Sequence, residues 1–173
     1  MRFEDLPYPE NRKNLERLHR RLNKVIYNGT LCDRIIYDIE NLENAYGCYF
    51  TARLGDKEKK GISFSHEMEN LLKAAKSAQE QVYLAANVML HEMAHQYCDE
   101  SGIDDIDHGK KWREVAREHG FNITDTPEDM GELNTWGMFA VRNFRWRHAY
   151  ERAFYWTKNG YKTREEMQKC GTN

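Results

Sequence analysis

The sequence predicts an α+β fold in which a small sheet precedes one long buried helix and a mostly helical segment follows it. Three observations predict this class. Apolar residues recur at helical spacing between residues 10 and 27, β-branched and aromatic residues cluster between residues 31 and 65, and almost no polar face is left between residues 77 and 102. We expect a single domain over residues 1–173, with a core of about residues 10–122 and an extension of about residues 128–173.

The composition excludes several classes of protein. Charged residues make up 31% of the chain, and no apolar run reaches membrane-spanning length. The segment Met1–Glu4 does not begin a signal peptide, so we expect a cytoplasmic protein without a membrane partner. We also expect a monomer. The formal net charge is −2, so nucleic-acid binding would need a local basic patch. Four scattered cysteines, without a C-x-x-C pair, argue against a disulfide framework and a cysteine zinc site: Cys32, Cys48, Cys98 and Cys170.

The first part of the chain predicts one helix and three strands. After an irregular lead-in from Phe3 to Pro9, residues Glu10 to Tyr27 form an amphipathic helix. Its basic face is either a solvated surface or a binding surface. The strands are Arg34–Ile39, Ala45–Leu54 and Gly61–Ser65, and the charged turn Gly55–Lys60 joins the last two.

The long helix has both ends marked in the sequence. A short helix from Glu67 to Ala75 leads to Ser77-x-x-Glu80, which has the form of a capping box. Ser101-Gly102 places a glycine where the helix would stop. Because its residues are apolar nearly all round, we expect this helix to lie in the core.

This helix carries the motif His91-Glu92-x-x-His95. Residues four apart lie about 40° apart around a helix axis, so His91 and His95 project side by side, with Glu92 at the margin of the same arc. Unpaired polar groups on a buried helix are costly, and a metal ion would satisfy them. The layout is that of a zinc hydrolase, in which Glu92 reaches a water on the metal without ligating the metal itself.

A third histidine completes the predicted zinc site. After a short acidic loop, His108-Gly109 opens another helix that carries Trp112. The short loop returns the chain to the first two histidines, so His108 is the candidate third ligand of Zn²⁺. His119 lies on the packing face of that helix, and we interpret it as a core histidine. The acidic alternatives for the third ligand are Asp105, Asp107 and Glu114.

The last third of the chain is basic and aromatic. We expect a loop from Phe121 to Pro127, mostly helical structure from Glu128 to Asn159 and a short helix from Thr163 to Lys169. Between Arg142 and Arg164, arginines and lysines alternate with aromatic residues. Such a segment either packs a terminal helix onto the domain or binds DNA through phosphate contacts and base stacking.

The two histidine motifs, preceded by a strand pair and the basic helix, make the chain similar to the SprT-like zinc metallopeptidases, the family that includes Spartan. The resemblance covers roughly residues 10–122. It implies a zincin-like minimal metalloprotease in which His91, His95 and His108 hold zinc and Glu92 is the general base and acid. Spartan-type relatives degrade proteins crosslinked to DNA. Many relatives carry a zinc ribbon of paired cysteines after the catalytic part, where this sequence has only Cys170.

Three hypotheses follow for function. The first is a zinc-dependent endopeptidase that acts on a protein or peptide, including DNA-associated proteins, with the substrate added to an exposed strand edge at Gly61–Ser65. The alternative is a non-enzymatic module in which zinc stabilises a nucleic-acid or protein-binding surface. A third is a different zinc hydrolase that acts on an amide or small peptide. The sequence names no oxyanion-stabilising residue.

Overall fold

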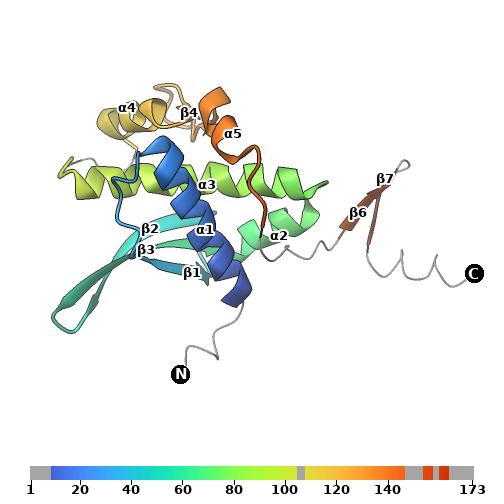
Figure 1. Cartoon of the computed structure of the whole chain (residues 1–173), viewed down its shortest axis with the longest axis horizontal. Helices are drawn as coiled ribbons and strands as arrows, with labels where there is room; N and C mark the ends of the chain where they lie inside the picture. Colours follow the sequence, from blue (N-terminus) through green and yellow to red (C-terminus); the bar gives the residue numbers. More distant parts are fainter. Residues whose placement is uncertain (1–8, 105–107, 147–153, 158–159, 164–173) are drawn as a thin grey trace, which may run out of the picture.

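The computed structural model describes residues 9–104, 108–146, 154–157 and 160–163. Within these ranges the chain is α+β, with five helices and a small mixed sheet. Figure 1 shows the long helix α3 (Ala78–Glu100) crossing the middle of the molecule, with the three-stranded sheet on one side and α4 (Lys110–Glu118) and α5 (Thr135–Val141) on the other. None of the described helices combines the length and the apolar composition needed to cross a bilayer.

Helix α1 (Pro9–Ile26) packs against α3 through an apolar stripe. Every third or fourth residue of this stripe is buried: Leu15, Leu18, Leu22 and Ile26. The helix begins at Pro9, so placing Pro9 in an irregular lead-in was wrong. Proline is tolerated in the first turn because the amide hydrogen that it lacks has no partner within the helix there. Residues 3–8 lie outside the described part.

The sheet consists of β1 (Ile36–Glu40), β2 (Gly47–Leu54) and β3 (Lys57–Ser65), in the order β1-β3-β2. Strand β3 pairs in parallel with β1 and antiparallel with β2. It is longer than predicted, because the turn shrinks to Gly55-Asp56 and Lys57–Lys60 continues the pairing with β2. Residues 61–65 are therefore central, so their prediction as a free edge was wrong. Strand β3 lies between the other two, so β1 and β2 are the edge strands.

The predicted cap at Ser77 is confirmed, and the short helix predicted from Glu67 begins one residue earlier, after a cap at Ser65 that was not predicted. The side chain of Ser65 accepts from the Met68 amide at 3.0 Å and caps α2 (His66–Ala74). The side chain of Ser77 accepts from the Glu80 amide at 3.1 Å and caps α3. At the far end, Gly102 has a φ of 66°, which stops the helix in the left-handed region that glycine adopts readily.

The segment after α4 is less helical than predicted. It contains the two-residue strands β4 (Phe121–Asn122) and β5 (Glu132–Leu133), the short helix α5, and an antiparallel hairpin of β6 (Phe154–Thr157) and β7 (Gly160–Thr163). Among the described residues between 128 and 159, only α5 is helical, so the mostly helical prediction for Glu128–Asn159 was wrong there; residues 147–153 and 158–159 lie outside the described part. Aromatic residues also favour strands, and Asn159-Gly160 is a hairpin signal. Thr163 ends β7, and residues 164–169 of the predicted last helix lie outside the described residues.

Candidate metal centre

The middle of α3 faces a cleft of about 1030 Å³. Strand β2 forms one wall, the segment before β5 contributes another, and His91, Glu92 and His95 lie along the floor. No lysine or arginine lines this cleft in the part of the chain that the structure describes. The motif residues thus sit where an extended molecule could reach them from solvent.

The three predicted ligand histidines converge at one point. The Nε2 atom of His108 lies 2.8 Å from Nε2 of His91 and 3.1 Å from Nε2 of His95. Tetrahedral zinc with Zn–N bonds of about 2.0–2.1 Å would set its nitrogen ligands roughly 3.3 Å apart. The donor set and its spacing therefore fit a zinc ion after an adjustment of about half an ångström. In the described residues, no other cluster of three His, Cys, Asp or Glu side chains has metal-binding spacing.

His108 reaches this point through an unusual backbone conformation. Its φ of 62° lies in the left-handed region, which non-glycine residues rarely adopt. The next residue, Gly109, is the N-cap of α4. One turn later Trp112, with no exposed surface, contacts all three imidazoles at ring-centroid distances of 4.6 to 5.1 Å. The indole thus packs the three rings against one another.

Burial keeps two of these imidazoles neutral. Burial, together with the neighbouring histidine rings, lowers the pKa of His91 to about 3 and that of His95 to about 4. At neutral pH both rings therefore carry a lone pair for a metal ion and no proton has to be displaced.

Glu92 is held beside the histidines, nearly buried at 5% exposure. Its Oε2 accepts a hydrogen bond from the backbone amide of Tyr49 on β2 at 2.8 Å. Burial raises the pKa of Glu92 to about 7, although the Tyr49 hydrogen bond acts in the opposite direction. A carboxyl group with this pKa can both accept and return a proton near neutral pH.

Strand β2 approaches α3 this closely because residue 47 is glycine. A Cβ atom built on Gly47 would lie 2.6 Å from Cγ1 of Val88 and 3.0 Å from Oε1 of Glu92. Any larger residue would push the strand away from the helix. Gly47 is thus what allows the Tyr49 amide to reach Glu92.

A comparison with protein families identifies the chain. The model of the SprT-like family matches residues 15–132, more than half of its length. The chain belongs to the SprT-like family. The match begins in α1, covers the sheet, α3 and α4, and ends in β5. Neither the curated proteins nor the solved structures gave a match.

None of the acidic alternatives for the third ligand is seen in the histidine cluster of the described residues. Glu114 is exposed on α4, and Asp105 and Asp107 lie outside the described residues. His119, interpreted as a core histidine, stacks on Tyr27 with ring centroids 4.2 Å apart, and its Nδ1 lies 2.7 Å from the Val115 carbonyl oxygen. Its ring therefore packs between helices, as the sequence predicted.

The basic-aromatic segment of the SprT-like domain is described only in part. Phe144 is buried, and the guanidinium of Arg17 lies 5.4 Å from the centre of its ring. Arg17 also donates to the carbonyl oxygen of Arg145 at 3.0 Å. The start of the segment therefore packs on α1, in line with the packing interpretation. Most of the Arg142–Arg164 stretch lies outside the described residues or has no described side chains.

Several residues that shape the site were not predicted from the sequence. Gly47 was predictable, since an isolated glycine in a strand pattern indicates close backbone approach. Tyr49 contributes a backbone amide, and Met130 contributes a carbonyl oxygen, 3.3 Å from Nδ1 of His91. Backbone groups leave no trace in residue type, so no sequence signal could have found these two.

Proposed function

We propose that this SprT-like protein is a zinc-dependent endopeptidase. The observation that carries the proposal is the convergence of three imidazole nitrogens next to a buried glutamate, in a cleft bordered by a strand edge. Membership of the SprT-like family supports a metallopeptidase-type role. The fold around the site is then of the zincin type, with α3 as the active-site helix.

Zinc is the metal that the donors favour. Three neutral imidazoles are typical of catalytic zinc sites, in which a fourth position stays open. His91, His95 and His108 would hold the ion. When bound, zinc would supply a Lewis acid that polarises a peptide carbonyl and makes water easier to deprotonate.

Glu92 would carry the proton. Its Oε2 is occupied by the Tyr49 amide, whereas Oε1 receives no hydrogen bond from the described residues. Oε1 is therefore the atom that would take a proton from the attacking water and deliver it to the amine nitrogen of the leaving peptide. Burial of the side chain keeps the pKa of the carboxyl group high enough to return that proton.

The edge of β2 would bind the substrate. Tyr49 directs its amide away from β3 towards Glu92, and in an antiparallel ladder the backbone groups of alternate residues face the same way. Gly47 and Thr51 therefore also present backbone groups on the open side. An extended peptide could pair with them and cross the histidine cluster.

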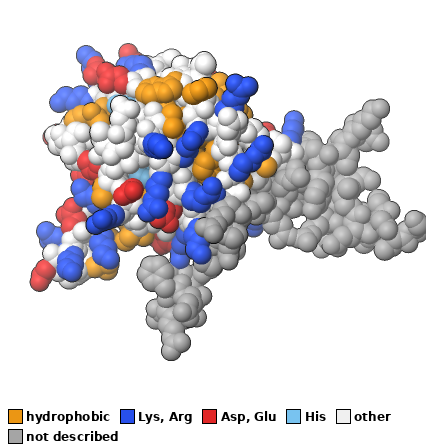
Figure 2. Space-filling model, in the orientation of Figure 1, with side chains coloured by type: hydrophobic (Ala, Val, Ile, Leu, Met, Phe, Trp, Pro, Cys, Tyr) orange, Lys and Arg blue, Asp and Glu red, His pale blue; other side chains and the backbone are white. Residues whose placement is uncertain are grey.

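We extend the proposal to DNA-associated proteins as substrates. Figure 2 shows lysine and arginine side chains gathered on the face that α1 crosses. The exposed basic side chains of α1 are Lys13, Arg20, Arg21 and Lys24. A basic surface of this kind can contact phosphates, and such contacts weaken with salt.

The test compares the wild type with Glu92→Gln. We expect one zinc per chain in both proteins by elemental analysis, and cleavage of casein by the wild type only, with and without single-stranded DNA. Glu114→Gln, an exposed change on α4, is the matched control and should keep full activity. Cleavage by Glu92→Gln would refute the role of Glu92. Zinc binding without any cleavage by the wild type would favour the non-enzymatic module instead.

A further inference from the structure

His91 is oriented by a backbone carbonyl. Its Nδ1 lies 3.3 Å from the carbonyl oxygen of Met130. A carbonyl oxygen can only accept, so Nδ1 must carry the ring proton and Nε2 must carry the lone pair. Nε2 is the atom that faces His108 at 2.8 Å. The position of the Met130 carbonyl therefore decides which nitrogen of His91 is available to a metal ion.

Met130 lies at the end of a loop without regular structure, from Ile123 to Met130. This loop is tied to α4 by Arg113, which is only 5% exposed. Its guanidinium donates from Nη1 to the carbonyl oxygens of Thr124 at 2.6 Å and Asp129 at 3.2 Å, and from Nη2 to that of Pro127 at 3.3 Å. One buried side chain thus holds the loop at three carbonyl groups, and one of them belongs to Asp129, the residue before Met130.

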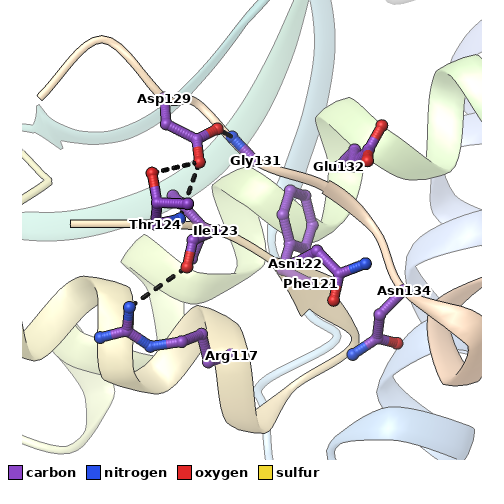
Figure 3. A pocket seen from close by; sticks show the side chains of 9 residues that line it. All are labelled: Arg117, Phe121, Asn122, Ile123, Thr124, Asp129, Gly131, Glu132 and Asn134. Atoms are coloured by element: carbon purple, nitrogen blue, oxygen red, sulfur yellow. Dashed lines mark hydrogen bonds between the residues drawn. The ribbon is translucent and has the colours of Figure 1, made fainter. Parts of the chain in front are cut away.

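The carboxylate of Asp129 closes the loop from the other side. It accepts from the amide and hydroxyl of Thr124, both at 2.7 Å, and from the amide of Gly131 at 2.9 Å, as Figure 3 shows. Two residues further on, the amide of Leu133 donates to Oδ1 of Asn87, one helical turn before His91. The residues on both sides of Met130 are therefore fixed.

We propose that Arg113 is a positioning residue of the metal centre. It acts through the loop of residues 124–129 and the Met130 carbonyl to hold His91 as the Nδ1–H tautomer with Nε2 aimed at the ion. This inference rests on the proposed zinc site. It gives adjacent residues of α4 two roles: Trp112 packs directly on the imidazoles, whereas Arg113 orients one of them from a distance.

The experiment uses two changes in the loop support and one control. Arg113→Met removes the guanidinium but keeps most of the side-chain length, and Asp129→Asn weakens the loop closure at a partly exposed site. Arg117→Met is the control, because Arg117 lies one turn away on the same helix and contacts only the start of the same loop, at Ile123 and Asp125, and not Asp129 beside Met130. Zinc affinity is measured on the metal-free proteins by competition with a chromophoric chelator.

We expect Arg113→Met to weaken zinc binding by about 10- to 100-fold, the usual effect of losing a partner that orients a metal ligand. Asp129→Asn should weaken it less, and Arg117→Met should leave it within about twofold. Because Arg113 acts through His91, Arg113→Met should change zinc affinity by less than about threefold when introduced into His91→Ala. Equal weakening in both backgrounds would overturn the inference, and so would unchanged affinity of both loop variants.

The ring nitrogens give a second readout that needs no metal. In ¹⁵N-histidine NMR spectra of the metal-free wild type, His91 should appear as the Nδ1–H tautomer. In Arg113→Met it should shift towards a tautomer mixture, and in Arg113→Lys partly back, since lysine keeps the charge but lacks the planar fork. If Arg113→Met does not fold, Asp129→Asn carries the same test. A wild type with the expected tautomer but without zinc affinity would refute the proposed function, whereas an unchanged tautomer in both loop variants would refute this inference.

Discussion

The replacement Gly47→Ala tests the link between the sheet and the candidate general base. The added methyl group would lie 2.6 Å from Cγ1 of Val88, about 1 Å inside the optimal carbon–carbon separation of roughly 3.5–4.0 Å. Val88 cannot turn aside easily, because a β-branched side chain in a helix has one strongly preferred rotamer. The strand must therefore move away, and the Tyr49 amide moves away from Glu92 with it.

Two effects of different size should follow from Gly47→Ala. Overpacking typically costs about 1–3 kcal/mol of unfolding free energy, and each kcal/mol lowers the melting temperature by about 2–4 °C in a domain of this size. A displacement of about 1 Å at a catalytic group can lower the rate by roughly 100-fold. We therefore expect a modest loss of stability, a large loss of kcat for casein cleavage, and nearly unchanged zinc affinity.

A second glycine provides the control. A Cβ atom on Gly61 would lie 2.4 Å from Cζ of Phe50 and 2.7 Å from the Ile36 carbonyl oxygen, so Gly61→Ala also destabilises the sheet. Its methyl group does not touch Glu92, and at a temperature where both variants are folded it should retain much more activity. Full activity and normal stability of Gly47→Ala would contradict the close-approach argument. Equal losses of activity in both variants would contradict the link to Glu92.

Three further predictions concern pH, metal removal and the rim of the cleft. In metal-free Glu92→Gln, His91 and His95 have lower pKa values in the folded than in the unfolded protein, so their contribution to stability is complete above pH 6.5 and is lost as pH falls towards 4. The free energy of unfolding should fall by up to about 1.4 kcal/mol per pH unit and group. An unfolding free energy in urea that does not change over this pH range would refute the prediction. Zinc removal by a chelator should change the fluorescence of the indole packed on the three histidines, and zinc should restore it; in Trp112→Phe this change should disappear. Tyr49→Phe removes a 2.6 Å hydrogen bond to Asp99 at the rim of the cleft and should cost less than about 1.5 kcal/mol of unfolding free energy while raising KM more than it lowers kcat. An unchanged KM would exclude a role of this hydroxyl contact in shaping the cleft for the substrate.

The sequence predicted best where side chains alone determine structure. Local signals at Ser77 and Gly102 predict where α3 begins and ends. Helix geometry then predicts that His91 and His95, four residues apart, project side by side. His108 could be identified because the loop before it is too short to carry it far from α3. The helix start at Pro9 was missed by one residue, since the same proline is compatible with a lead-in and with a first turn.

The sequence predicted least where pairing partners or backbone groups decide. The strands were recognised, but their order was not, because periodicity does not say which neighbour a strand will pair with, and Gly61–Ser65 was placed at the wrong position in the sheet. The segment after Glu128 was read as helical because aromatic residues at mixed spacing fit both periods. The Met130 carbonyl and the Tyr49 amide are backbone groups. Nearly every residue has such groups, so nothing in the sequence distinguishes these two.

The candidate ligands come from α3 and from the residue before the N-cap of α4, and this has a consequence for folding. An ion shared by α3 and the start of α4 would act as a cross-link between them, so zinc loading should slow amide hydrogen exchange in α4 and in the loop that Arg113 holds, while leaving the strand pair β1 and β3 nearly unchanged. Loss of zinc would then do more than abolish catalysis. It would loosen one wall of the cleft and expose that loop to degradation, so the supply of the ion would also set how long the protein survives.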